Sequence, residues 1–224
     1  KVVTEFDGRQ VEELYDRVLV AVGRRPNSTD LGLENTRVQL DDKGFVKVNS
    51  GQQTDDPQIY AIGDIAGGVL LAHKAHKEAR IAVEVILGEA SRFENIVIPA
   101  VVFTDPELAW CGLTEAEARE RNITCEVTKF PWSASGRAMS FDRTDGLTKM
   151  VIDPESERVL GVGIVGAGAG ELIAEAALAL EMGATAEDIA LTVHPHPTLS
   201  ETLMEAAEAY YGHATHTLAR KRVG

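Results

Sequence analysis

Two kinds of hydrophobic pattern follow one another along the first ninety residues. Short apolar stretches separated by turn residues come first: a hairpin turning at Asp7-Gly8, the run 18–22 and the run 58–62. Continuous apolar runs of this length, bounded by turn residues, are typical of buried strands, and we expect both runs to be strands. From about residue 69 to 87 the spacing becomes helical. Strand, Gly-Asp turn and long helix together predict a βα corner of a doubly wound α/β fold.

The pattern changes after Glu94. We expect extended segments and helices to be mixed there without regular βαβ alternation, which indicates a separate α+β domain. A capping box at Thr114 and Glu117 marks one helix start. The expected extended segments are 96–103, 123–130, 147–152 and 158–166, and the expected helices are 114–121, 169–182, 186–191 and 198–211.

Composition and charge narrow the possible partners. The 224 residues are 44% hydrophobic and carry a net charge of -13, which argues against nucleic acid and anionic membrane surfaces as partners. The two cysteines, Cys111 and Cys125, match no metal or redox spacing, and a reducing cytoplasm fits them best. No stretch is long and apolar enough for a membrane span. The chain opens as if inside a hairpin, without an initiator Met, so we expect a fragment.

Asp64 is the first candidate for function. It follows an apolar run and a glycine, and the next helix directs its N-terminus toward the same space. A flavin whose ribityl hydroxyls contact Asp64, and whose reduced ring lies near that N-terminus, would be stabilised by both. An ordinary Asp turn is the alternative.

His196 and Glu201 are the second candidate, within the sequence His194-Pro-His-Pro-Thr-Leu-Ser-Glu201. An imidazole oriented by a carboxylate is a general acid–base pair. Three alternatives stay open: His196 is a turn residue beside proline, Glu201 completes a capping box with Thr198, or His194 takes the acid–base role.

Two further patterns point more weakly to ligands. Gly161, Gly163 and Gly166 match G-x-G-x-x-G, but the first two lie inside an expected strand and Glu181 stands where the acidic partner is required, so close strand–helix packing is favoured. The pairs His73/His76 and His213/His216 are spaced i,i+3 without a third ligand nearby, so no metal site is expected.

Four motifs, taken together and in order, carry a family resemblance: 21–26 (AVGRRP), 59–64 (IYAIGD), 70–75 (LLAHKA) and 194–201 (HPHPTLSE). With them the chain resembles the flavin-dependent pyridine nucleotide–disulfide oxidoreductases over essentially its whole length, most closely those that oxidise dihydrolipoamide. The resemblance implies that 1–26 ends an NAD-binding domain, 27–97 is the returning part of an FAD-binding domain, and 98–224 is a dimerisation domain. The fold class is thus an α/β, Rossmann-like remnant followed by an α+β domain.

The resemblance also implies roles for particular residues and partners. His196 would accept the proton of the dithiol substrate, with Glu201 orienting it, inside the active site of the other subunit of a homodimer. Gly23 would lie near the nicotinamide nucleotide. FAD contacts are implied for Asp64, Leu70, Leu71, Ala72 and His73. The implied protein partner is the dihydrolipoyl-bearing acyltransferase of a 2-oxo acid dehydrogenase complex.

The departures from the family pattern are large. The FAD-binding glycine motif, the redox cysteine pair four residues apart and the glycine-rich NAD turn are not in this sequence, and Pro195 replaces a small residue. We therefore expect the C-terminal half of such an enzyme, inactive without its N-terminal half. A glutathione-reductase-like enzyme and a non-catalytic dimerisation module are the alternatives.

Overall fold

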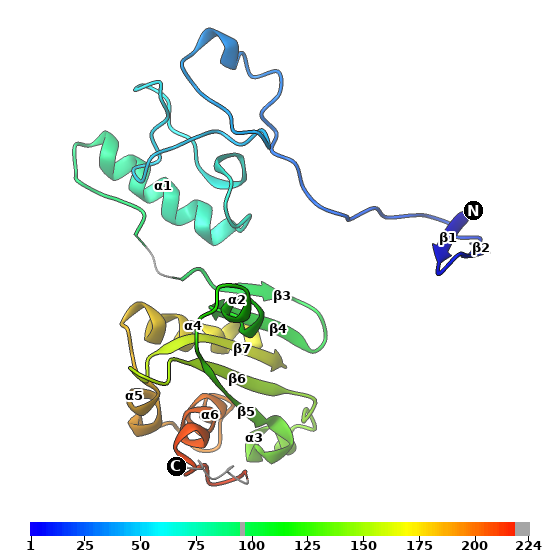
Figure 1. The fold of residues 1–224 in the computed structure, drawn as a ribbon, viewed down its shortest axis with the longest axis vertical. Coiled ribbons are helices and arrows are strands. Elements are labelled where there is room, and N and C mark those ends of the chain that lie inside the picture. Colours follow the sequence, from blue (N-terminus) through cyan, green and yellow to red (C-terminus); the bar gives the residue numbers. More distant parts are fainter. Residues whose placement is uncertain (95–96, 218–224) are drawn as a thin grey trace.

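The computed structural model describes residues 1–94 and 97–217 (Figure 1). Position 96 of the expected segment 96–103, and positions 218–224 of the expected last domain, lie outside the described residues. Buried apolar side chains form two separate clusters. The larger cluster runs from Val97 to Tyr210, and the smaller one centres on Val38, Val46 and Ala61. The two clusters fall on either side of the boundary expected near residue 97.

A five-stranded antiparallel sheet forms the centre of the C-terminal part, in the order β3-β4-β7-β6-β5. Helix α4 packs on β3, β4 and β7, while α6 packs on β5, β6 and the neighbouring α5 (Figure 1). The strands are β3 (Ala100–Val102), β4 (Glu107–Gly112), β5 (Glu126–Pro131), β6 (Leu147–Ile152) and β7 (Val159–Gly166). The helices are α2 (Glu115–Glu120), α3 (Gly136–Ser140), α4 (Ala169–Glu181), α5 (Ala186–Leu191) and α6 (Glu201–Tyr211), with the 3-10 turn η3 (Trp132–Ala134).

Most elements expected in this part are confirmed. The capping box is present, since the Thr114 hydroxyl accepts from the Glu117 amide while the Glu117 carboxylate accepts from the Thr114 amide. Helix α5 matches the expected range 186–191. Strand β4 and helix α3 were not expected. The mixed sheet-and-helix fold class is as the sequence indicated.

The N-terminal part contains fewer regular elements. The expected hairpin is confirmed, with β1 (Val2–Phe6) and β2 (Arg9–Glu13) pairing antiparallel around Asp7 and Gly8, both at positive φ. The long helix is also confirmed as α1 (Ala72–Ile86). Short 3-10 turns form at η1 (Leu33–Asn35) and η2 (Gly63–Ala66).

The two buried strands expected at 18–22 and 58–62 do not form. Leu19 and Val22 are 90% and 93% exposed. In the second run, the β-pairing seen among the described residues is an isolated bridge between Gln53 and Tyr60. A strand buried in a parallel sheet needs hydrogen-bonded neighbours along its edges, and no described segment lies beside 18–22 to supply them. The doubly wound sheet is therefore not assembled within the described residues.

The glycine-rich run 161–166 serves packing. A Cβ on Gly161 would lie 2.0 Å from the Leu113 carbonyl oxygen, and one on Gly166 would lie 2.3 Å from the ring of Trp132. Close packing was expected here, but the neighbours are a strand-end backbone and the fully buried Trp132, whereas a helix was expected. Within the described ranges, no helix is long and apolar enough to cross a membrane.

Candidate acid–base and flavin sites

His196 and Glu201 are in contact at the start of α6. Nδ1 of His196 lies 2.8 Å from Oε1 of Glu201, and the His196 side chain is 71% exposed. The loop 192–200 brings the ring back over the first turn of the helix, with a cis peptide bond between His196 and Pro197. Because the carboxylate accepts at Nδ1, it favours the tautomer in which Nε2 is free to exchange a proton with a ligand.

The two carboxylate oxygens of Glu201 bind different groups. Oε1 is next to His196, and Oε2 accepts from the Thr198 amide at 2.7 Å. Only half of the expected capping box forms, since the Thr198 hydroxyl donates to the Pro195 carbonyl. Burial raises the pKa of Glu201, but the hydrogen bonds from the Thr198 amide and His196 outweigh it, leaving this pKa below its ordinary value. The acid–base and capping readings of Glu201 are therefore compatible.

His194 points the other way. Its side chain is 4% exposed, with Nδ1 2.8 Å from the Thr192 carbonyl oxygen and Nε2 2.6 Å from Oε1 of Glu175. Because both ring nitrogens are already hydrogen-bonded inside the protein, His194 has no free nitrogen to offer a substrate.

A buried hydrogen-bond chain fixes the first turn of α6 to the sheet. Trp132 Nε1 donates to the Thr148 hydroxyl at 3.0 Å, and that hydroxyl donates to Thr202 at 2.8 Å. All three residues are almost fully buried. Since Thr202 follows Glu201 directly, this chain also fixes the backbone that carries the carboxylate.

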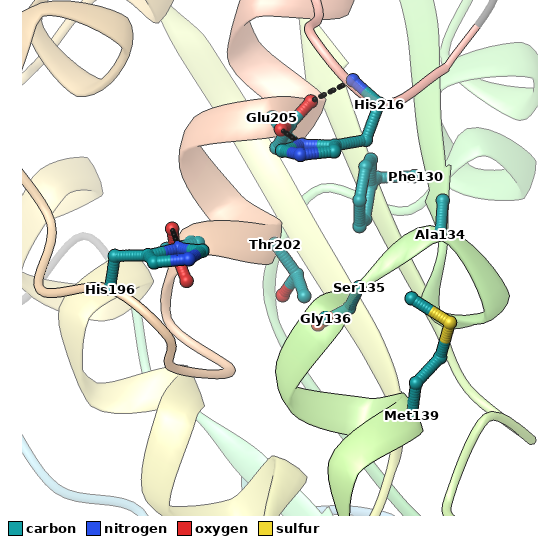
Figure 2. A pocket seen from close by; sticks show the side chains of 10 residues that line it. Phe130, Ala134, Ser135, Gly136, Met139, His196, Thr202, Glu205 and His216 are labelled. Atoms are coloured by element: carbon teal, nitrogen blue, oxygen red, sulfur yellow. Dashed lines mark hydrogen bonds and ion pairs between the residues drawn. The ribbon is translucent and has the colours of Figure 1, made fainter.

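A second His–Glu pair shares a small pocket with the first. The pocket, of about 130 Å³, lies between α6, α3 and the segment after α6 (Figure 2). Glu205, buried one turn beyond Glu201, accepts from the His216 amide at 3.4 Å and is hydrogen-bonded to Nδ1 of His216. This hydrogen bond raises the pKa of His216. The lining residues are Phe130, Ala134, Ser135, Gly136, Met139, His196, Glu201, Thr202, Glu205 and His216.

Sequence reasoning missed this second pair. The sequence singles out His216 only in the pair His213/His216, where no metal site is expected. The available signal was the i,i+4 spacing of Glu201 and Glu205, which places both carboxylates on one helix face.

The cofactor candidates gather at a second corner, around η2 and the start of α1. Asp64 is exposed, and its Oδ2 lies 3.5 Å from Nη1 of Arg24, which also donates to the Leu70 carbonyl at 3.4 Å. Leu71 precedes α1 without a side-chain cap, so the first-turn amides, starting at Ala72, have no capping side chain. Gly23, with φ of +142°, adjoins Arg24 and is exposed.

His73 differs from its expected surroundings. It lies in the first turn of α1, but its Nε2 is 2.7 Å from the Pro99 carbonyl oxygen, in the segment leading into β3. One ring nitrogen is thus occupied by a contact between the two parts of the chain. Its place beside a cofactor stays a prediction.

Lys74 and Glu78 form a buried ion pair next to the turn that carries Asp64. The sequence analysis does not include this pair. Nζ of Lys74 lies 2.6 Å from Oε1 of Glu78, with both side chains at most 7% exposed. The signal was a Lys–Glu pair at i,i+4 on the same side of α1 as Ile81 and Ala82, which are buried.

The two cysteines do not form a disulfide with each other. Both thiols are free, and burial raises the pKa of Cys111 to about 12. All residues lining the His196 pocket come from positions 130–216, whereas the flavin candidates lie at 64–73 and the nicotinamide candidate is Gly23. The acid–base candidates and the cofactor candidates therefore lie in different parts of the chain.

Two protein-family profiles match this chain. Residues 1–79 match the profile described as pyridine nucleotide-disulphide oxidoreductase, and residues 98–207 match the dimerisation domain of the same family. The chain therefore belongs to the pyridine nucleotide-disulphide oxidoreductase family.

Within this family, relatives similar to this chain include dihydrolipoyl dehydrogenases. The protein of Thermus scotoductus is 54% identical over 95% of this chain and 46% of its own length, and that of Vibrio cholerae is 50% identical over 91% and 43%. The crystal structure of LpdA from Mycobacterium tuberculosis superposes with a TM-score of 0.82 at 31% identity, covering 91% of this chain and 44% of LpdA. The chain thus spans a little under half the length of these relatives.

Proposed function

We propose that this chain is the C-terminal half of a flavin-dependent dihydrolipoyl dehydrogenase, which oxidises dihydrolipoamide and passes electrons through a disulfide and FAD to NAD. The observation that carries the proposal is the contact between His196 and Glu201, with the ring otherwise open to solvent. The identity of about 50% to dihydrolipoyl dehydrogenases over nearly the whole chain supports it.

His196 is the proposed acid–base residue. With Nδ1 hydrogen-bonded to Glu201, Nε2 accepts the proton released when a dithiol substrate becomes a thiolate, and returns it in the reverse reaction. Glu201 holds the ring orientation and stabilises the imidazolium. The Trp132–Thr148–Thr202 chain keeps Glu201 in place beneath it.

The Asp64 corner fits FAD chemically. An exposed carboxylate accepts hydrogen bonds from hydroxyl groups, and the uncapped first turn of α1 offers amide donors to electron-rich atoms. Asp64, Leu70, Leu71, Ala72 and His73 would hold FAD, and Gly23 would lie beside NAD. FAD, when bound, supplies the electron transfer between the thiol chemistry and NAD.

The partners follow from the same proposal. Residues 1–26, 27–97 and 98–224 would be the end of an NAD domain, the returning part of an FAD domain and the dimerisation domain. In a homodimer, His196 of each subunit would serve the other's disulfide.

A dihydrolipoyl-bearing acyltransferase of a 2-oxo acid dehydrogenase complex would deliver the substrate. The two free cysteines fit a reducing cytoplasm as the location of the enzyme.

The first test measures lipoamide oxidation by this chain alone and in a chimaera. The chimaera joins the N-terminal half of the Thermus scotoductus relative to Lys1, supplying the sequence that this chain does not contain. We expect no turnover by the chain alone and flavin-dependent turnover by the chimaera. Turnover by the chain alone, or an inactive chimaera that has bound its flavin, contradicts the proposal.

The second test replaces the acid–base residue within the chimaera. His196→Gln should lower kcat by about 10²–10⁴-fold with the flavin content unchanged, because proton transfer is lost while the cofactor corner stays intact. His76→Gln, an exposed histidine on α1, is the matched control. Normal turnover of His196→Gln would remove this residue from the mechanism.

A reductase of low-molecular-weight disulfides is the second candidate. The HOCl-induced flavoprotein disulfide reductase RclA from Escherichia coli superposes with a TM-score of 0.82 at 27% identity over 92% of this chain. Comparing kcat/KM of the chimaera for dihydrolipoamide and for glutathione disulfide separates the two activities. A non-catalytic dimerisation module, the third reading, predicts a stable dimer without either activity.

A further inference from the structure

Lys74 and Glu78 place two charges in the interior of the N-terminal part. Their atoms Nζ and Oε1 are 2.6 Å apart, and the side chains are 7% and 6% exposed. Lysine and glutamate are almost never buried unless paired, and a buried pair is poor as a stabilising device because both charges lose their hydration. Stabilisation of the fold therefore does not explain why this ion pair is buried.

Both members of the pair bind the same residue, Gly63. Oε2 of Glu78 accepts from the Gly63 amide at 2.7 Å, and Nζ of Lys74 donates to the Gly63 carbonyl at 3.4 Å. The backbone of this glycine is thus held on both of its polar groups. Gly63 has φ of +75°, a conformation that glycine reaches easily but also leaves easily.

Asp64 follows Gly63, and its own contacts do not fix it. Its carboxylate is exposed, and its ion pair with the exposed Arg24 is 3.5 Å long, a kind of surface contact that restrains a side chain weakly. The direction in which Asp64 presents its carboxylate is therefore set by the Gly63 backbone, which the buried pair holds.

We propose that Lys74 and Glu78 are positioning residues that clamp Gly63, so that Asp64 faces the hydroxyl groups of the flavin ribityl chain. This deepens the proposed function and rests on it. Both side chains extend from α1 and bind the backbone of the turn that precedes Asp64. Loss of the clamp weakens flavin binding by freeing the turn.

The decisive experiment compares two double variants in the chimaera. K74M/E78Q removes both charges but keeps a side-chain oxygen to accept from the Gly63 amide, whereas K74M/E78L removes the acceptor as well. R80M/E84Q is the matched control, because Arg80 and Glu84 form an i,i+4 ion pair on the same helix with an exposed arginine and no contact with Gly63. FAD dissociation constants, thermal midpoints and amide hydrogen exchange at Gly63 are measured for each.

We expect K74M/E78L to bind FAD about tenfold more weakly or worse. K74M/E78Q loses only the longer Lys74 contact with Gly63, so its FAD affinity should fall between those of K74M/E78L and the parent. Fast Gly63 exchange should accompany the weak binding, and R80M/E84Q should match the parent. Parental FAD affinity in K74M/E78L, or equal losses in both double variants, overturns the proposal. Should K74M/E78L not fold, K74M/E78Q decides: a Gly63 amide that loses protection while FAD affinity persists also overturns it.

A failure of the proposed function is distinguishable from a failure of the clamp. Asp64→Ala tests the flavin contact itself without altering Gly63. If Asp64→Ala leaves FAD affinity unchanged, the flavin assignment of Asp64 fails, whatever the double variants do. If Asp64→Ala weakens FAD binding and K74M/E78L does not, the assignment stands and the clamp alone is wrong.

Discussion

At the scale of single residues, Glu201 can both orient His196 and cap the start of α6, because each of its two carboxylate oxygens binds a different group. One oxygen orients His196, and the other accepts the Thr198 amide at the start of α6. A carboxylate that is held by the backbone cannot swing away when the ring changes its protonation state. The helix terminus thereby becomes the rigid support of the proposed acid–base residue.

Gly161 and Gly163 lie in the same strand, β7, and substituting each of them tests whether the glycine-rich run serves packing. Gly161→Ala should destabilise the protein by about 1–3 kcal/mol, because its methyl group would overlap the Leu113 carbonyl. Gly163→Ala, in the same strand with open space at its Cβ, is the control and should be neutral or mildly stabilising. Urea unfolding of both variants measures the difference. Equal stabilities would contradict the packing role of Gly161.

At the scale of elements, the anchoring of α6 depends on a buried hydroxyl. Thr202→Val removes the acceptor of the Thr148 hydroxyl and should cost about 1–3 kcal/mol in the free energy of unfolding. Thr128→Val is a matched control, because the buried Thr128 hydroxyl has no hydrogen-bond partner within the described residues. That change should be neutral or stabilising. Chemical denaturation compares the two, and a larger loss in Thr128→Val would refute the anchor.

The segment after α6 should loosen with rising pH. Its His216 has a raised pKa because Glu205 hydrogen-bonds the ring, with Glu201 and Glu208 adding attraction. A raised folded-state pKa means that the stabilisation is complete below the unfolded value, near 6.5, and is lost as pH rises through the folded value. Amide protection factors in 213–217, taken relative to the intrinsic exchange rate at each pH, should accordingly be higher at pH 6 than at pH 9. Glu205→Gln should lower the pKa of His216 in an NMR titration, and an unchanged titration would refute the coupling.

Elements that are determined by neighbouring residues in the sequence could be predicted, whereas elements and contacts that depend on residues far away in the sequence could not. The capping box at Thr114 and the helix at 186–191 follow from neighbouring residues and form as expected. The runs 18–22 and 58–62 have the composition of strands, but a strand exists only where another strand pairs with it. The contact between His196 and Glu201 could be anticipated from their spacing. The Glu205–His216 and Gly63 contacts could not, because each joins residues across a turn or a loop.

At the scale of the whole molecule, the two clusters of buried side chains differ greatly in size. The larger cluster includes twenty-one buried residues, all between Val97 and Tyr210, whereas the smaller includes three. A domain comprising residues 98–224 should therefore fold alone and unfold cooperatively. Limited proteolysis of the whole chain should cut first in the exposed segment 14–24 and leave this domain intact. Early cleavage within 98–217 would contradict the division.

The exposed run 18–22 has a practical consequence for anyone who prepares this chain. Its backbone amides and carbonyls are unpaired by any described strand, and its valines and leucine face water. An open apolar edge of this kind is a template for intermolecular β-pairing, and thus for aggregation. The net charge of -13 opposes such association at low ionic strength, but added salt screens that repulsion. Concentrated stocks should consequently keep best in dilute buffer, and a complementary polypeptide that occupies the edge should remove their sensitivity to salt.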